Sequence, residues 1–137
     1  MAEFRKVTES FWVAPQIDLA EVARAKAEGF TLIINNRPDG EAPDQPRASE
    51  IEAAARAAGI AYVFAPVTGR PGANDIAAVR AASGGAAKTL AFCRSGTRSI
   101  MTWALGQATA DNRADLIRLG EAAGYDLSAV LGETNRP

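Results

Sequence analysis

The chain has 137 residues, of which 47% are hydrophobic and 23% are charged, with a formal net charge of −1. This length and composition are ordinary for one globular domain, so we expect a single domain over residues 1–137 that needs no metal or disulfide to fold. A nucleic acid or an acidic membrane would favour a strong basic excess, and the near-neutral charge argues against both partners.

The chain has one cysteine and no histidine. A single cysteine rules out an internal disulfide and fits a reducing compartment. The lack of histidine excludes Ser-His-Asp and Cys-His catalysis and removes the commonest metal ligand, so we expect neither a metal nor a cofactor. No signal-peptide pattern and no apolar run of membrane-spanning length is visible, and we therefore expect a cytoplasmic protein.

Short apolar runs alternate with helical patterns along the chain, which is typical of an α/β fold. We predict a β-hairpin over residues 4–14 and further strands over residues 30–34, 60–64 and 89–92. We predict helices over residues 19–28, 50–58, 75–82, 99–110, 113–123 and 127–131. This order predicts a three-layer α/β domain, with a mostly parallel sheet of four or five strands flanked by helices on both sides.

Polar residues and glycines mark the ends of these helices. Asp18, Ser49 and Asn74 are placed to cap the N-termini of the first three helices. Gly29 and Gly59 follow the first two, where a residue in the left-handed conformation commonly ends a helix.

A polar loop follows the strand at residues 89–92. Its residues are Cys93, Arg94, Ser95, Gly96, Thr97, Arg98 and Ser99. A loop of small residues at a helix start presents backbone N–H groups to an anion, and the helix dipole adds to their attraction. Gly96 lets the loop curl, and Arg98 offers a planar fork to a phosphate, sulfate or thiosulfate. The loop residues are therefore candidate anion ligands.

Cys93 is the candidate nucleophile of this loop. An electropositive loop favours the thiolate, which is the reactive form of cysteine. The alternative is a structural cysteine, because free cysteine is among the most buried residue types. The polar residues after Cys93 would make a poor core, so we favour the reactive thiol. Ser99 is placed either to cap the helix or to hydrogen-bond the sulfur.

A second polar loop, at residues 35–41, holds two more candidates. One interpretation places it over the cysteine loop, where Arg37 binds an anion and Asp39 donates a proton. The other is a plain turn, because Pro-Asp-Gly is favourable turn chemistry, with Arg37 paired to a carboxylate for structure. Arg94 and Arg70 likewise either line the pocket or point to solvent. The residues alone leave these alternatives open.

Three segments carry a resemblance to a known family: GFTLIINNRPDGE at 29–41, ARAAGIAYVFAPV at 55–67 and LAFCRSGTRS at 90–99. They resemble the phosphatase-like domain of bacterial beta-lactamase hydrolase-like proteins. The run Cys93–Ser99 also looks like the active loops of protein tyrosine and dual-specificity phosphatases and of rhodaneses. The resemblance implies a protein tyrosine phosphatase-like α/β fold. It leaves the reaction open, because members are described both as phosphatase-like and as sulfurtransferases.

The length of the cysteine loop favours sulfur transfer. The phosphatase signature places five residues between cysteine and arginine, whereas four residues, Arg94–Thr97, separate Cys93 from Arg98, as in rhodaneses. A shorter loop makes a smaller cradle, which we expect to fit a persulfide sulfur better than a phosphoryl group. Phe92 stands where a phosphatase usually has histidine.

The general acid is a second departure from the phosphatase pattern. Hydrolysis of a phosphate ester needs a proton for the leaving group. The place where dual-specificity phosphatases carry an aspartate holds Thr68-Gly69-Arg70, so Asp39 or Glu41 would have to substitute. Sulfite leaves thiosulfate as an anion and needs less help.

We therefore predict a sulfurtransferase with rhodanese-like activity. Cys93 takes the outer sulfur of thiosulfate or a persulfide, Arg98 and the loop N–H groups hold the charged intermediate, and an external small thiol such as glutathione accepts the sulfur. One alternative is a phosphatase that forms a phosphocysteine, with Asp39 as the acid. Another is a persulfide carrier or thiol sensor for a partner enzyme. Family members are also found fused to a persulfide dioxygenase, which is a possible partner here.

Overall fold

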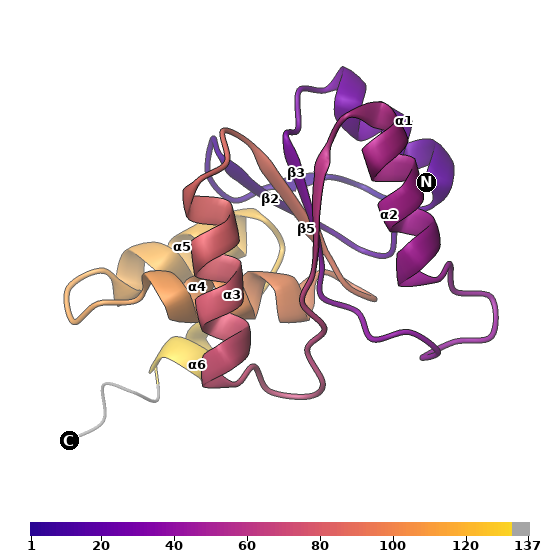
Figure 1. Cartoon of the computed structure of the whole chain (residues 1–137). Helices are drawn as coiled ribbons and strands as arrows, with labels where there is room; N and C mark the ends of the chain where they lie inside the picture. Colours follow the sequence, from indigo (N-terminus) through magenta and orange to yellow (C-terminus); the bar gives the residue numbers. More distant parts are fainter. Residues whose placement is uncertain (133–137) are drawn as a thin grey trace.

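The computed structural model describes residues 1–132, in which one sheet lies between two groups of helices (Figure 1). Its strands are β1 (Arg5–Lys6), β2 (Phe11–Ala14), β3 (Leu32–Asn35), β4 (Ala61–Phe64) and β5 (Thr89–Phe92). Its helices are α1 (Leu19–Ala27), α2 (Ala48–Ala58), α3 (Ala73–Gly84), α4 (Thr97–Gln107), α5 (Arg113–Ala122) and α6 (Ser128–Leu131). The predicted three-layer α/β architecture is confirmed.

The sheet order is β1-β2-β5-β3-β4, with β5 at the centre. Only the β1–β2 hairpin is antiparallel, so β2, β3, β4 and β5 all end at the same edge of the sheet. Phe92, the last residue of β5, is in register with both Ala14 and Asn35, the last residues of the neighbouring strands. The loops after these strands therefore meet at one place, which is where parallel α/β sheets bind ligands.

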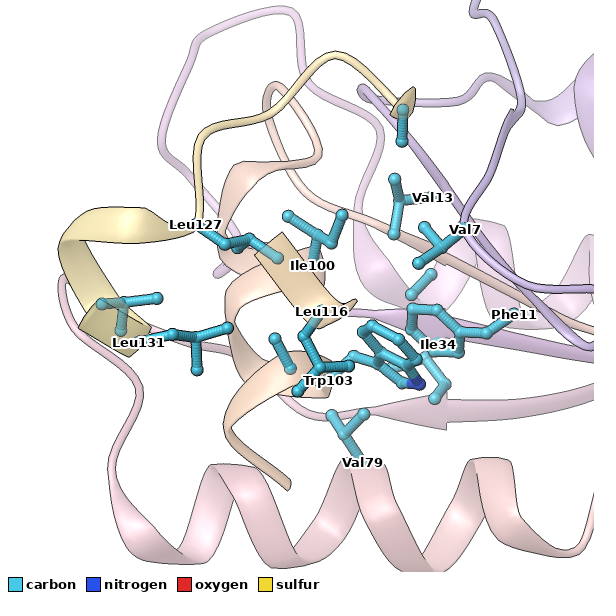
Figure 2. Close-up of a cluster of buried hydrophobic side chains, with 14 of the residues drawn as sticks. Val7, Phe11, Val13, Ile34, Val79, Ile100, Trp103, Leu116, Leu127 and Leu131 are labelled. Atoms are coloured by element: carbon cyan, nitrogen blue, oxygen red, sulfur yellow. The ribbon is translucent and has the colours of Figure 1, made fainter. Parts of the chain in front are cut away.

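The two faces of the sheet carry separate apolar cores. Helices α1 and α2 cover one face, and α3 to α6 cover the other (Figure 1). In the larger core, drawn in Figure 2, the Phe11 ring stacks on Trp103 with centroids 5.2 Å apart. Val79, Leu116 and Leu131 bring α3, α5 and α6 onto the same cluster. None of the helices in residues 1–132 is long and apolar enough to cross a membrane.

Several predicted boundaries are confirmed by the local chemistry. Strand β5 has the predicted bounds, and the β1–β2 hairpin lies within the predicted one. Asp18 caps α1 through a capping box, in which its carboxylate accepts from the Glu21 N–H and the Glu21 side chain accepts from the Asp18 N–H. Gly59 ends α2 with a φ of 77°, in the left-handed region.

Two predicted caps are wrong, because Ser49 and Asn74 lie inside helices. The first N–H of α2, on Ala48, donates to Asp39 Oδ1 at 2.7 Å, so a carboxylate nine residues upstream caps this helix. Helix α3 begins one residue before Asn74, and the Gly72 N–H donates to Asp75 Oδ2 at 2.8 Å. A pattern read over four or five residues cannot show the cap of α2, because that cap comes from the preceding loop.

Candidate active site

The end of β5 delivers Cys93 to the centre of the sheet edge. Backbone hydrogen bonds from both flanking loops hold the chain there. The Asn36 N–H donates to the Phe92 carbonyl at 2.8 Å, and the Gln16 N–H donates to the Arg94 carbonyl at 3.2 Å. The residues after β2 and β3 therefore fix the direction in which the cysteine loop leaves the sheet.

The loop turns so that a backbone donor meets the sulfur. The Gly96 N–H donates to Cys93 Sγ at 3.1 Å, and α4 begins at the next residue, Thr97. Gly96 has a φ of +91°, which side chains rarely adopt. A Cβ here would also overlap the Tyr125 hydroxyl and lie 3.3 Å from the Ala14 carbonyl oxygen. Glycine is required, and it places the sulfur at the positive end of α4.

Burial of the thiol does not make it an ordinary core residue. Cys93 is 0% exposed, whereas Arg94, Ser95 and Thr97 in the loop beyond it are exposed. The sulfur accepts a backbone N–H and interacts electrostatically with the Arg98 guanidinium. An apolar structural site offers neither partner, so these surroundings favour the interpretation of Cys93 as a reactive thiol.

The Arg98 fork is held by a carboxylate from the second loop. Its Nη1 and Nη2 donate to the two carboxylate oxygens of Glu41, each at 2.8 Å, and Nη1 also donates to the Val67 carbonyl at 2.8 Å. Glu41 accepts a further hydrogen bond from Arg37 Nε at 3.0 Å, and Arg37 Nη1 donates to Gln16 Oε1 at 3.0 Å. One carboxylate thus joins the two arginines, and through them the loops after β2, β3 and β4 are connected to the first turn of α4.

This pairing determines the charge of Glu41. The hydrogen bond from Arg98, ahead of the opposing effect of burial and the further bond from Arg37, lowers the pKa of Glu41 to about 2. The same hydrogen bond raises the pKa of Arg98 above its usual value. Glu41 is therefore a carboxylate throughout the neutral range and has no proton to donate. Its single negative charge leaves one positive charge in excess on the arginine pair.

The Asp39 side chain bonds to the start of α2. It is exposed, and its Oδ1 accepts the Ala48 N–H that begins α2. That hydrogen bond connects it to a helix on the other side of its loop, not to the cysteine loop. Arg37 is only 5% exposed and is paired to Glu41, so its position agrees with the carboxylate-paired alternative.

Of the remaining predicted residues, some are exposed to solvent and one is buried. Arg94 and Arg70 are both exposed, and Ser95 Oγ lies 3.0 Å from Thr97 Oγ1. Ser99 is fully buried, and its hydroxyl has no hydrogen-bond partner among the described residues. The structure therefore provides neither the predicted helix cap nor a bond from Ser99 to the sulfur.

Three residues that contact the site were not predicted as part of it. The sequence pattern marks Glu41 only as a substitute acid and does not mark Gln16 or Tyr125. Arg37 and Glu41 lie four residues apart, but they are in a loop, where i, i+4 spacing does not predict a contact as it does on a helix. Tyr125, whose hydroxyl donates to the Ser95 carbonyl at 2.9 Å, lies 30 residues further along the chain, and no local pattern marks it.

The described residues offer no metal site. No group of three or more Cys, Asp or Glu side chains within residues 1–132 is placed to hold a metal ion, and the whole chain lacks histidine. The chemistry that these residues support is attack by a thiolate and binding of a small anion.

Comparison with known proteins agrees with this geometry. The family model for the phosphatase-like domain of beta-lactamase hydrolase-like protein matches residues 3–110. A beta-lactamase hydrolase-like protein of Agrobacterium fabrum is 37% identical over 129 residues. That match covers 91% of this chain but 30% of the relative, so the chain spans about a third of the relative's length.

Solved structures show the same fold. A candidate phosphatase from Neisseria meningitidis superposes with a TM-score of 0.84 and 30% identity, covering 96% of this chain and 95% of that one. Tk-PTP in its active form has a TM-score of 0.67 and 16% identity, covering 95% and 91% of the two chains, which shows likeness of fold alone. The predicted protein tyrosine phosphatase-like fold is confirmed.

Proposed function

The chain belongs to the family of phosphatase-like domains of beta-lactamase hydrolase-like proteins, and from this premise we propose that it is a sulfurtransferase with Cys93 as its sulfur carrier. The phosphatase-like family and fold support an enzyme, and Cys93 is its candidate nucleophile. The choice of sulfur as the group transferred is our proposal, and it rests on the chemistry around the thiol.

One observation carries the proposal: neither carboxyl group that could serve as general acid is free to do so. Glu41 is held ionised between two arginines, with a pKa of about 2. The Asp39 carboxylate caps α2. Phosphate-ester hydrolysis needs a proton for its alkoxide or phenoxide. Transfer from thiosulfate releases sulfite, which departs as an anion without a proton donor.

The proposed reaction has two displacements. The Cys93 thiolate attacks the outer sulfur of thiosulfate, the sulfur–sulfur bond breaks, and sulfite leaves with the electron pair. Cys93 then carries a persulfide. A small thiolate such as that of glutathione attacks the outer persulfide sulfur, and the Cys93 thiolate leaves. Because the chain has one cysteine, this acceptor comes from outside.

The loop supplies electrostatic stabilisation for both steps. The Gly96 N–H and the start of α4 face the sulfur, so a negative persulfide has a donor in place before it forms. Arg98, oriented by Glu41, supplies the charge that attracts thiosulfate. The exposed Arg94 is placed to draw an anionic substrate or the carboxylates of glutathione toward the loop.

A phosphatase is the second candidate, and the comparisons favour it over sulfur transfer. The family is described as phosphatase-like, and the Neisseria meningitidis structure is that of a candidate phosphatase. In this alternative the Cys93 thiolate attacks phosphorus and a phosphocysteine forms. The leaving group would then take its proton from water, or from Asp39 after release of its cap.

Paired assays on the same preparation test the two candidates. Wild type and Cys93→Ser are given thiosulfate with glutathione or cyanide, and separately an aryl phosphate. We expect sulfur transfer by wild type, loss of it in Cys93→Ser, and no aryl-phosphate turnover dependent on Cys93. The opposite pattern would replace the sulfurtransferase with the phosphatase.

A persulfide carrier would give a third pattern. Cys93 would gain sulfur from thiosulfate but release none to glutathione unless a partner were added. A persulfide dioxygenase is the partner to add first, because domains of the family that this chain resembles are found fused to one. Release to glutathione alone at catalytic rates would exclude this role.

A further inference from the structure

We propose that Tyr125 is a positioning residue of the active loop, and that its hydroxyl holds the Ser95–Gly96 peptide in the orientation that presents an N–H to Cys93. Tyr125 lies beyond the residues 3–110 that the family model matches. The inference rests on Cys93 being the nucleophile and is independent of whether sulfur or phosphate is transferred.

The inference rests on two hydrogen bonds made by one peptide unit, that between Ser95 and Gly96. The Ser95 carbonyl accepts from the Tyr125 hydroxyl at 2.9 Å, and the Gly96 N–H of the same unit donates to Cys93 Sγ at 3.1 Å. A trans peptide is planar, so its C=O and N–H point in opposite directions. Fixing the carbonyl outward therefore fixes the N–H inward, on the sulfur.

Gly96 gives this peptide unit the freedom to rotate. Glycine accepts positive and negative φ about equally, so the φ of +91° is not enforced by the residue itself. Rotation of the peptide would turn the Ser95 carbonyl toward the thiolate and remove its donor. The preceding carbonyl, of Arg94, is already held outward by the Gln16 N–H. Tyr125 supplies a side-chain restraint on the Ser95–Gly96 peptide.

Tyr125 is itself firmly placed. Its backbone N–H donates to the Gly120 carbonyl at 2.8 Å, and the Arg5 guanidinium lies 5.4 Å from its ring centroid. Leu127, two residues on, belongs to the same buried cluster as Ile100 in the first turns of α4 (Figure 2). The segment between α5 and α6 is therefore joined to the helix that the cysteine loop begins.

The hydroxyl is suited to donate. Burial raises the pKa of Tyr125, so the group keeps its proton in the neutral range, and nearby Arg5 only partly opposes this effect. The charged groups around the thiol are otherwise Arg98 with its partner Glu41 on the other side of the loop, and Glu3 beside Tyr125. Tyr125→Phe changes none of these charges and keeps the ring that Arg5 contacts. It removes the hydroxyl, whose bond to the Ser95 carbonyl is the one that reaches the cysteine loop.

The test follows thiolate formation directly, by the ultraviolet absorbance of the single cysteine across a pH series. Cys93→Ser supplies the baseline for tyrosine ionisation. Tyr125→Phe keeps the ring and removes the hydroxyl, and Tyr62→Phe is the matched control, because the Tyr62 hydroxyl accepts from Asn35 Nδ2 and has no bond to the loop. No substrate is present, so the outcome is separate from that of the proposed function.

We expect Tyr125→Phe to lower the acid dissociation constant of the thiol about fivefold, the factor that corresponds to one ordinary hydrogen bond. We also expect the Gly96 amide to exchange with solvent faster, while the Tyr62→Phe protein stays like wild type in both measurements. An unchanged thiol titration in folded Tyr125→Phe, or an equal change in both variants, would overturn the proposal.

Discussion

The two loops at the active edge of the sheet are held in different ways. The cysteine loop is fixed by backbone groups and by a glycine that tolerates no Cβ. The loop at 36–41 is fixed by its charged side chains, with Arg37 and Glu41 paired and Asp39 on α2. The first loop places the candidate nucleophile, Cys93, and its hydrogen-bond donor. The second loop holds Arg98 through Glu41. The reactivity of the thiol and the orientation of Arg98 therefore depend on different loops and can be perturbed separately.

Glycine substitutions should give the largest contrast between the loops. Gly96 and Gly40 both have positive φ, but a Cβ on Gly40 meets nothing within 4 Å. We expect Gly96→Ala to reduce kcat/KM by about a hundredfold or more, as expected when a preorganised donor is lost. Gly40→Ala should cost about 1 kcal/mol of stability from backbone strain and leave activity within a few-fold of wild type. Steady-state kinetics and thermal melts measure both, and similar losses of activity would remove the distinction.

Substitutions of Arg98 and Arg37 should show the next largest difference in activity. Arg98→Lys replaces the two-point contact with Glu41 by a point charge and misplaces it relative to the anion, so we expect a loss of about ten- to a hundredfold in kcat/KM. Arg37→Lys keeps a charge near Glu41 and should cost only a few-fold. Both variants are compared in the same assay and by melting temperature. A larger effect at Arg37 would mean that it, and not Arg98, binds the substrate.

Glu41→Gln tests the charge that orients Arg98. The pKa of Glu41 is lowered from 4.5 to about 2 in the folded protein, so its carboxylate stabilises the fold above pH 4.5, and this contribution is lost as the pH falls through about 2. Glu41→Gln should therefore be less stable than wild type at neutral pH, and the difference should shrink as the pH falls below 4.5. Denaturant unfolding along a pH series measures it. A constant difference at all pH values would rule out the ion pair as its cause.

Asp39→Asn should have the smallest effect. Asparagine caps a helix about as well as aspartate, so we expect a change of a few tenths of a kcal/mol in stability and activity within about twofold of wild type. A catalytic acid at this position would instead make the change costly by about a hundredfold or more, with loss of one limb of the pH profile. The pH dependence of kcat/KM in the two proteins distinguishes the outcomes.

Much of the fold and the position of the cysteine loop could be predicted from sequence. The apolar run at Thr89–Phe92 and the small polar residues after it predicted the strand, the loop and the helix start, because those signals are local. The order of strands and helices likewise predicted the layers. The same local signals predict Cys93, Gly96 and Arg98 as residues of the anion-binding loop.

The rest depends on contacts between distant segments. The Asp39 cap on Ala48 replaces the cap predicted at Ser49, and nothing near Ser49 indicates it. Glu41 reaches Arg98 across 57 positions, and Tyr125 reaches Ser95 across 30. The Glu41–Arg98 pair follows from the way parallel strands β3 and β5 bring their ends together, whereas the Tyr125–Ser95 pair depends on how α5 and α6 pack against α4. The sequence of any one segment carries no mark of either pair.

The mass of the protein after brief exposure to substrate tests the central claim most directly, because a thiolate enzyme forms its intermediate on Cys93. After thiosulfate we predict the addition of one sulfur atom to wild type, none to Cys93→Ser, and its removal by glutathione. After an aryl phosphate we predict no added phosphoryl group. A phosphoryl adduct on Cys93, with no sulfur adduct from thiosulfate, would contradict the account.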